Sequence, residues 1–427
     1  MNNFNLNKTL LNKPNINWLG KVPIHWEVKK FKNIASLNKW DKLDYIELRL
    51  CLENIESETG RYIESDSEFQ GSGNFIKPND ILFGKLRPYL AKVLLSNFYG
   101  ECVSEIYVFS AIEKILFYKF LYYICISCEF IKEVNSFAFG SKMPRADWSS
   151  IRNIDVPMPN LSTQKAIVKF LDYKTDLIAQ FITDKKDMIE RLYEQKQSLI
   201  YNAVTKGIEK DIKYKSSGIP WIGSVPQEWN IISLKLISKI FSGGTPSKDI
   251  NEYWENGTIP WLASGEVNQG FITYPTTYIT EEALKNSSAK WIKQNSLVIA
   301  LAGQGKTKGM VGYLEFESTC NQSLGVIEPN TRIVNEKFLY YFLKSIYNQI
   351  RGLTGEDIRD GLNLQLIGQL KIPLTNLNNQ ELIVKYLDQE TAKIDKLIQT
   401  ITKEIELVEE YQKSLIYKAV TGKLEIV

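Results

Sequence analysis

The chain is poor in the residues from which most catalytic and metal sites are built. Its 427 residues include one histidine, His25, and five cysteines scattered between Cys51 and Cys320. A single histidine excludes most catalytic triads and most zinc sites. An odd and dispersed set of cysteines is typical of a reducing cytoplasm rather than of a disulfide scaffold, so we expect a cytoplasmic protein. We interpret His25, which precedes Trp26, as a packing residue.

Long apolar runs and an excess of charge are missing too. No apolar run reaches about eighteen residues, and the first ten residues are polar and rich in asparagine, so we expect no membrane span and no secretory signal. The 52 basic and 49 acidic residues leave a net charge of +3, so any basic surface for nucleic acid has to be local. With 44% hydrophobic and 12% aromatic residues, the composition indicates two or three ordinary globular domains.

Motifs of self-contained DNA-modifying enzymes are also absent. The chain has neither the Asn-Pro-Pro-aromatic tetrapeptide of amino-methyltransferases nor a glycine-rich loop for S-adenosylmethionine, and Asp80 and Lys85 are poorly spaced for a nuclease site. Cys125 and Cys128 have CxxC spacing but lie in an aromatic helix without a second pair, which favours a core position over metal or redox chemistry. Residues 300–307 (ALAGQGKT) meet the loosest phosphate-loop pattern, but a strand-like segment follows where a helix is needed. We expect the chain to catalyse nothing alone.

What the sequence does contain is an internal repeat. Residues 161–205 align without a gap with residues 377–421, and 20 of the 45 positions are identical. A shorter repeat precedes each copy, as WLGKVP at 18–23 and WIGSVP at 221–226, whereas the long segments between these anchors hardly resemble each other. Because internal repetition fixes the architecture, we predict one scaffold present twice, each copy holding a different domain.

Each long repeat is predicted to form one helix. Positions spaced alternately by four and three residues, from 164 to 203 and from 380 to 419, are mostly apolar over more than five heptads, which is the pattern of a coiled-coil seam. The simplest partner for each stripe is the other copy, packed antiparallel, with a globular domain near each end and a pseudo-two-fold axis. Lys185, Lys196 and Gln412 interrupt the seam, and we interpret them as snorkelling or register-setting layers, with a functional role as the alternative.

The predicted fold class is therefore mixed α/β (α+β), with two globular domains separated by two long antiparallel coiled-coil helices. Short apolar runs at 80–83, 296–300 and 309–314 are expected to be strands. Each domain should end with an aromatic helix (119–134 and 336–350) and a short strand that ends in proline (154–157 and 370–373). The predicted boundaries are an N-terminal arm at 1–19, domain one at 20–160, a long helix at 161–207, a linker at 208–217, domain two at 218–376 and a long helix at 377–427.

Several motifs resemble those of the specificity subunits of type I restriction-modification systems. They are WLGKVPIHWEV and WIGSVPQEWNI at the start of the two halves, DILFGKLRPYLAKV at 80–93, GSKMPRADW at 140–148, FSGGTPS at 241–247 and the repeated helices. The resemblance covers nearly the whole chain and implies two target-recognition domains, each reading one half of a split double-stranded DNA site. It also implies that the helices act as a ruler and as a docking site for two methyltransferase subunits, with restriction (translocase) subunits joining them. S-adenosylmethionine, ATP and magnesium would belong to those partners, with no cofactor in this chain.

Loops that carry cations and amides supply the candidate DNA contacts, because phosphates need cations and base edges need planar or amide side chains. On the residues alone, a charged hairpin tip is more often only solvated. With the resemblance, the predicted DNA-binding residues are Lys85, Arg87, Tyr89, Lys142, Arg145, Gln304, Lys306, Lys308, Asn321, Gln322, Arg351 and Arg359. The predicted coiled-coil and partner-docking residues are Leu171, Ile178, Ile182, Ile189, Leu199, Leu387, Ile394, Ile398, Ile405 and Leu415.

Two other kinds of protein stay open on the sequence alone. One is a non-DNA adaptor, in which a coiled coil assembles proteins and the two domains bind peptides or sugars. The other is a self-contained methyltransferase or nuclease, which the missing motifs disfavour. Neither the recognised bases nor the spacer length follows from the sequence, because DNA readout depends on loop geometry, water and DNA shape.

Overall fold

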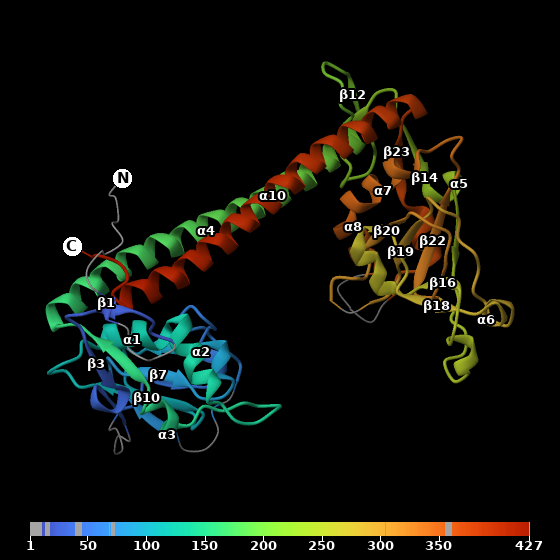
Figure 1. Ribbon diagram of the computed structural model, residues 1–427. Coiled ribbons are helices and arrows are strands. Elements are labelled where there is room, and N and C mark those ends of the chain that lie inside the picture. The colour runs from blue at the N-terminus through green and yellow to red at the C-terminus, as the bar shows by residue number, and fades with distance from the viewer. Residues whose placement is uncertain are drawn as a thin grey trace. The chain divides into compact units, whose positions relative to one another are not determined.

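The computed structural model describes residues 11–12, 18–38, 45–67, 69, 73–303, 305–354 and 361–426 (Figure 1). They divide into two compact units, and each unit joins one globular domain to parts of both long helices. Unit 1 draws on residues 1–186 and 401–427, and unit 2 consists of residues 187–400. The mixed α/β class and the internal repeat predicted from the sequence are both confirmed.

Domain one, in unit 1, contains an antiparallel sheet with the strand order β4-β10-β7-β8. A second sheet has the order β5-β9-β6, with β5 and β9 parallel. The bounds of these strands are β4 Ala35–Leu37, β5 Leu48–Leu50, β6 Asn74–Ile76, β7 Ile81–Gly84, β8 Val93–Leu95, β9 Gly100–Cys102 and β10 Ile106–Ala111. The flanking elements are β1 Leu11–Asn12, β2 Val22–Pro23, β3 Glu27–Lys30, α3 Trp148–Ile151, β11 Asp155–Met158 and the short 3₁₀ turns Phe31–Asn33, Leu52–Asn54 and Pro88–Leu90.

Domain two, in unit 2, has a main sheet with the order β15-β22-β19-β20-β17 and a smaller sheet with the order β18-β16-β21. The strand bounds are β15 Ser238–Ser242, β16 Ile259–Leu262, β17 Phe271–Ile272, β18 Thr277–Ile279, β19 Leu297–Ala300, β20 Val311–Leu314, β21 Thr319–Cys320 and β22 Leu324–Pro329. The flanking elements are β12 Tyr214–Ser216, β13 Ser224–Pro226, β14 Asn230–Ser233, α5 Leu234–Ile237, α6 Glu281–Lys285, α9 Leu364–Gln369, β23 Lys371–Leu374 and the 3₁₀ turns Asn251–Tyr253 and Ser264–Gln269.

The two domains share a topology that their sequences conceal. In chain order, β4, β7, β8 and β10 correspond to β15, β19, β20 and β22, and both sets are ordered in the same way across the sheet. The parallel pair β5–β9 likewise corresponds to the parallel pair β16–β21. The domains therefore differ in their edges and loops while the frame that carries those loops is the same.

Each domain was expected to end with one aromatic helix, and this prediction is wrong in detail because both helices are broken. In domain one, α1 Tyr118–Ile126 is followed by α2 Cys128–Ser136, and Ser127 between them has an extended backbone. In domain two, α7 Glu336–Ser345 is followed by α8 Tyr347–Gly352, with Ile346 outside helical geometry. Buried side chains on both pieces of each broken helix belong to the same apolar cluster.

The proline-ended strands predicted at the end of each domain are present, one residue further along the chain than expected. They are β11 and β23, and each pairs antiparallel with a strand near the start of its own domain, β3 and β14 respectively. Pro157 and Pro373 are tolerated because these ladders have only two strands, so no third strand needs the missing N–H group. Each strand leads directly into a long helix.

The long helices are α4 Leu161–Lys206 and α10 Leu377–Val420 (green and red in Figure 1). In unit 1, Lys185 of α4 forms a 2.7 Å ion pair with Glu404 of α10. In unit 2, Lys196 forms a 2.6 Å ion pair with Asp395. In each unit the late part of one helix meets the early part of the other, as the antiparallel prediction requires. Each of the two lysines that interrupt the seam thus pairs with one carboxylate on the opposite helix. These ion pairs mark the register in which the two helices pack.

The seam prediction is wrong at the first turns of both helices. Gln164, Thr175, Gln380 and Thr391 occupy seam positions in the sequence, but their side chains bind the helix's own domain or its own backbone. These turns are built into the domain cores. In unit 1, Val168 and other early residues of α4 share one apolar cluster with domain one and with the end of α10. Periodicity alone cannot tell which neighbour covers an apolar or polar stripe.

The short repeat has the same role in both units, since it covers the end of a long helix. The Tyr201 hydroxyl, near the end of α4, donates to the carbonyl oxygen of Trp221. The Tyr417 hydroxyl, near the end of α10, donates to the carbonyl oxygen of Trp18. The prediction that His25 packs against its neighbours is wrong, because His25 is exposed while Trp26 is buried.

Candidate nucleic-acid interface

Two loops of domain one that the sequence analysis treated separately lie side by side. The backbone N–H of Ala146 donates to the carbonyl oxygen of Lys85 at 2.8 Å, and that of Arg87 donates to the carbonyl oxygen of Pro144 at 2.7 Å. The structure thereby brings four of the predicted cations onto one edge of the main sheet. We call this set the domain-one basic edge, and it consists of Lys85, Arg87, Lys142 and Arg145.

The cations of this edge are not equally available to a phosphate. Arg87, Lys142 and Arg145 are all exposed, but Arg145 already donates to the Glu105 carboxylate at 3.0 Å. The Lys85 ammonium lies 5.4 Å from the centroid of the Tyr107 ring, in cation–π range. Arg87 has a left-handed backbone (φ 50°), a rare conformation for a residue that precedes proline. Such strain is concentrated at functional sites, and here the bond to Pro144 helps to hold it.

Tyr89 has a different neighbourhood from the basic edge. Its side chain is exposed and lines a pocket of about 450 Å³ together with Cys128 and Lys132 of α2 and Tyr417 of α10. The structure therefore brings Tyr89 together with helical residues rather than with the four cations.

In domain two, the loop between β19 and β20 carries two of the four predicted cations, Lys306 and Lys308, and Arg351 lies in helix α8 (Tyr347–Gly352). The carbonyl oxygen of Lys306 accepts a hydrogen bond from the Tyr347 hydroxyl at 2.6 Å, and Arg351 donates to the same hydroxyl at 3.0 Å. The Lys306 side chain is exposed. Tyr347 thus couples the loop to helix α8 and leaves the Lys306 ammonium at the surface. Two predicted contacts, Gln304 and Arg359, lie outside the described residues.

Lys308 does not fit its predicted role as a surface contact. Its side chain is only 5% exposed, and its ammonium group donates to the Thr354 hydroxyl at 2.7 Å. A buried ammonium must be hydrogen-bonded to offset its desolvation, so Lys308 supports the loop from inside. The sequence offered two lysines two residues apart, and only the structure separates the exposed one from the buried one.

Polar side chains of a neighbouring loop include a residue that the sequence analysis missed. The Thr245 hydroxyl donates to the side-chain oxygen of Gln322, which is exposed. The Asn321 side chain accepts from the backbone N–H of Ser323 at 3.1 Å. Thr245 belongs to the FSGGTPS motif, where a Cβ at Gly243 would collide with the backbone of Cys320. The glycine pair was a usable signal, because it marks a loop held close to its neighbour.

These loops occupy equivalent positions in the two domains. In domain one, the backbone N–H of Lys85, after β7, donates to the carbonyl oxygen of Glu105, before β10. In domain two, the N–H of Leu301, after β19, donates to the carbonyl oxygen of Ser323, before β22. The same edge of the same frame therefore carries different side chains in the two domains.

Other chemistry suggested by sequence patterns has a structural explanation. Cys125 is fully buried in α1, and burial raises the pKa of its thiol. Asp80, 2% exposed, accepts from the backbone N–H of Lys77 at 2.8 Å and from the Ser110 hydroxyl. The described residues after position 304 lead from the ALAGQGKT loop into strand β20 and not into a helix. Within the described ranges, no group of three or more possible metal ligands occurs, and no helix is both long and apolar enough to cross a membrane.

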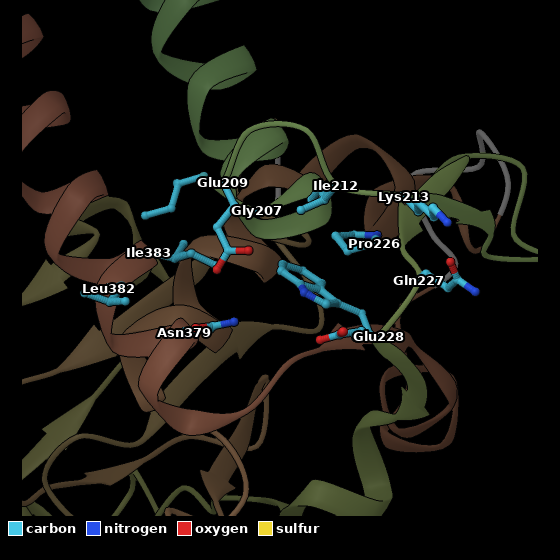
Figure 2. Close-up of a pocket in the computed structure, with 12 residues that line it drawn as sticks. Gly207, Glu209, Ile212, Lys213, Pro226, Gln227, Glu228, Asn379, Leu382 and Ile383 are labelled. Atoms are coloured by element: carbon cyan, nitrogen blue, oxygen red, sulfur yellow. The ribbon is translucent and has the colours of Figure 1, made fainter.

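A pocket of about 510 Å³ lies in unit 2 between the segment that follows α4 and the first turns of α10. Figure 2 shows Leu382 and Ile383 of α10 on one side and Lys213 and Gln227 on the other. Trp229 also lines it. None of the predicted DNA-binding residues is among its lining residues, so this pocket is separate from the candidate interface.

The predicted coiled-coil residues vary in burial. Those at most 8% exposed are Leu171, Ile178, Leu387, Ile398, Ile405 and Leu415. Those of intermediate exposure are Ile182, Ile189, Leu199 and Ile394. The buried members are already covered by the chain itself. Both helices also carry large apolar side chains that are exposed, namely Tyr173, Leu177, Phe181, Met188, Tyr193, Leu382, Tyr386, Leu397, Leu407 and Tyr411.

Comparison with known proteins identifies one family over most of the chain. The family described as "Type I restriction modification DNA specificity domain" matches twice, over residues 23–191 and 226–407. The type I restriction enzyme EcoR124I/EcoR124II specificity subunit of Escherichia coli is 28% identical over 270 residues, which cover 62% of this chain and 61%, less than two thirds, of that protein. The putative type I restriction enzyme MjaX specificity subunit of Methanocaldococcus jannaschii is 24% identical over 438 residues and 96% of each chain.

Two solved structures have the same fold. A chain of a structure described as "Structural basis underlying complex assembly and conformational transition of the type I R-M system" matches with a TM-score of 0.76 and 17% identity, over 95% of this chain and 100% of that one. The HsdS subunit from Thermoanaerobacter tengcongensis matches with a TM-score of 0.57 and 17% identity, over 95% and 98%. At these identities the likeness concerns the fold.

Proposed function

The chain belongs to the type I restriction-modification DNA specificity family, and on that premise we propose that it reads a bipartite duplex DNA site, one half with each domain. The observation that carries the proposal is the repeated frame with unlike loops: one edge presents Lys85 and Arg87, and the equivalent edge presents Lys306, Asn321 and Gln322. Two domains that read different base sequences require this combination, namely the same arrangement of strands with different side chains on the loops. Cations at each edge suit the phosphates, and amides suit base edges.

We further propose that catalysis belongs to partner subunits. Two methyltransferase subunits would methylate adenine with S-adenosylmethionine, and restriction subunits would use ATP and magnesium to translocate and cleave unmethylated DNA. The exposed apolar side chains on the long helices support such docking. Tyr173, Leu177 and Phe181 follow each other at intervals of four residues, and so do Leu407 and Tyr411, which places each group on one helix face. Exposed apolar faces of this kind are typical of protein interfaces.

Selection of bound duplexes from a random library tests this proposal. The chain, with its methyltransferase subunits, is expected to enrich duplexes that contain two short fixed sequences separated by a fixed number of unread base pairs. The non-DNA adaptor alternative predicts no enrichment and no shift of any duplex. Enrichment of one continuous sequence would contradict the bipartite reading.

The exposed and buried lysines of the β19–β20 loop provide a sharper prediction. Lys306→Ala is expected to weaken binding and to reduce the slope of log K against log salt by about 0.9, the contribution of one phosphate contact. Lys308→Met keeps most of the buried volume, so we expect a lower melting temperature and an unchanged salt slope. Titration of fluorescent duplex over a range of salt concentrations measures both slopes. A reduced slope for Lys308→Met would instead place that ammonium group at a phosphate.

A further inference from the structure

The first turns of each long helix bind their own domain through side chains that the sequence repeats. The repeated residues are Gln164 and Gln380, Asp172 and Asp388, and Thr175 and Thr391. They are identical in both halves, and so is the segment KFLYY (119–123 and 337–341) that carries the partners of the aspartates, although the rest of the two domains differs.

The first contact is a buried glutamine amide. In unit 1, the side-chain nitrogen of Gln164 donates to the carbonyl oxygens of Ile115 at 3.0 Å and Pro159 at 2.8 Å. Its side-chain oxygen accepts from the backbone N–H of Phe117, just before α1, at 2.8 Å. Gln164 is 0% exposed, so these bonds use the polar groups of the amide without help from solvent.

Unit 2 contains the same arrangement. The side-chain nitrogen of Gln380 donates to the carbonyl oxygens of Ile333 at 3.2 Å and Thr375 at 2.7 Å. Its oxygen accepts from the backbone N–H of Asn335, just before α7, at 2.8 Å. Gln380 is also 0% exposed.

The second contact is a carboxylate that holds the aromatic helix. In unit 1, Asp172 accepts from the Tyr123 hydroxyl at 2.7 Å and from the Lys119 ammonium at 2.6 Å. Thr175 lies 3.3 Å from the same hydroxyl. Burial raises the pKa of Tyr123, and Asp172 raises it further, so the phenol stays a donor.

In unit 2, Asp388 accepts from the Tyr341 hydroxyl and, at 3.1 Å, from the Lys337 ammonium. Thr391, at the position of Thr175, donates to the carbonyl oxygen of Leu387 in its own helix at 2.7 Å. Burial and the Asp388 carboxylate again raise the pKa of the phenol. The two units therefore repeat both contacts, with the same kind of donor group at each position.

Two attachment points fix direction as well as position. The glutamine and the aspartate are eight residues apart, or about 12 Å along a helix. A domain held at one point can pivot in every direction, whereas one held at two points this far apart can turn only about the line that joins them, and the apolar face of the helix that packs in the same cluster opposes that turn. Stability alone does not require these polar groups, because Ile167, Val168 and Leu171 already bury an apolar face in the same cluster. Partly buried polar networks contribute little net stability but can select one arrangement.

We propose that this two-point clamp positions each domain's loops relative to its long helix and thereby restricts the complex to one spacing between the two half-sites. The clamp is defined as Gln164, Asp172, Tyr123 and Lys119 in unit 1, and Gln380, Asp388, Tyr341 and Lys337 in unit 2. This proposal rests on the proposed function, the reading of a bipartite DNA site. The clamp residues contact no DNA, and they act through the domain that they hold.

The test uses the chain assembled with its methyltransferase subunits, and duplexes whose half-sites are separated by the selected spacing or by one base pair more or fewer. Tyr341→Phe and Asp388→Asn remove clamp bonds with almost no change in volume. Tyr340→Phe is the matched control, because Tyr340 is buried in the same helix. Its hydroxyl accepts a hydrogen bond from the Lys344 ammonium group and does not bond a residue of a long helix. Methylation rates on the three spacings are compared for each variant.

For both clamp variants we expect a higher ratio of the methylation rate at wrong spacings to the rate at the selected spacing. The expected increase is on the order of tenfold, which corresponds to the loss of one hydrogen bond to a charged group. Base preference within each half-site should not change, and Tyr340→Phe should behave like the unmodified chain. Equal losses at all three spacings would overturn the clamp proposal and leave the proposed function intact. A parent complex without any bipartite preference would overturn both.

Discussion

Replacement of residues 218–376 by the corresponding domain of another family member will change one half of the methylated sequence and leave the other half unchanged. The expectation follows from the division of the molecule, because the apolar clusters of domain two lie in unit 2, where one of them is shared with the long helices, and the domain-one basic edge lies in unit 1. Each wrong base pair costs about 1–3 kcal/mol, so a half-site with several wrong pairs will not be methylated detectably.

Sequencing of the methylated genome of cells that carry the exchange measures the outcome. The junctions leave Gln380 and Asp388 in the recipient helix, so the donor domain has to supply the lysine and tyrosine that stand at Lys337 and Tyr341. A donor domain without them is the matched control, and it should give the new half-site with relaxed spacing. Changes in both half-sites, or in neither, would contradict the modular reading.

Leu387→Ala will destabilise unit 2 by about 2–5 kcal/mol, whereas Leu407→Ala on the same helix will change stability by no more than about 0.5 kcal/mol. Leu387 is 0% exposed and belongs to the apolar cluster of unit 2, so its truncation leaves a cavity. Leu407 is 52% exposed, so its truncation leaves none. Urea unfolding followed by circular dichroism distinguishes the two variants.

Exposed residues of α10 also separate the contribution of this helix to folding from its contribution to partner docking. If the exposed apolar faces bind methyltransferase subunits, Leu407→Ala combined with Tyr411→Ala will weaken the complex on the order of tenfold, as expected for apolar anchors at an interface. The double variant should still bind duplex DNA through its loops. Unchanged affinity for the partner, measured by calorimetry, would exclude this face of α10 as the docking surface.

The two long helices were predictable because their apolar pattern is periodic and occurs twice in the sequence. Which element packs against each helical turn was not predictable. The sequence places Gln164 and Thr175 in phase with the seam, and only the fold shows that they face domain one. The breaks at Ser127 and Ile346 carry no glycine or proline, so the residue types at these positions give no local sign that the helix ends there. The apolar and aromatic pattern continues through both breaks and therefore predicts a single helix.

The candidate interface was predictable as a set of loops, but not as a set of contacts. The two loops of the domain-one basic edge are more than fifty residues apart in the sequence, and backbone hydrogen bonds bring them together. Lys306 and Lys308 are chemically equivalent in the sequence, yet one is exposed and the other is buried. Thr245 was overlooked because its role depends on Gln322, which is far along the chain.

Unit 1 is built from two segments that are far apart in the chain, and this affects how the protein is synthesised. The core of unit 1 includes Leu415, Ile416, Ala419 and Val420, which close an apolar cluster begun by Trp18 and Leu19. A nascent chain therefore cannot complete its first domain until residues near 420 have left the ribosome, by which time all of unit 2 has been translated. The domain translated first is thus the one whose apolar cluster is completed last, and the surface that the end of α10 covers stays uncovered until then.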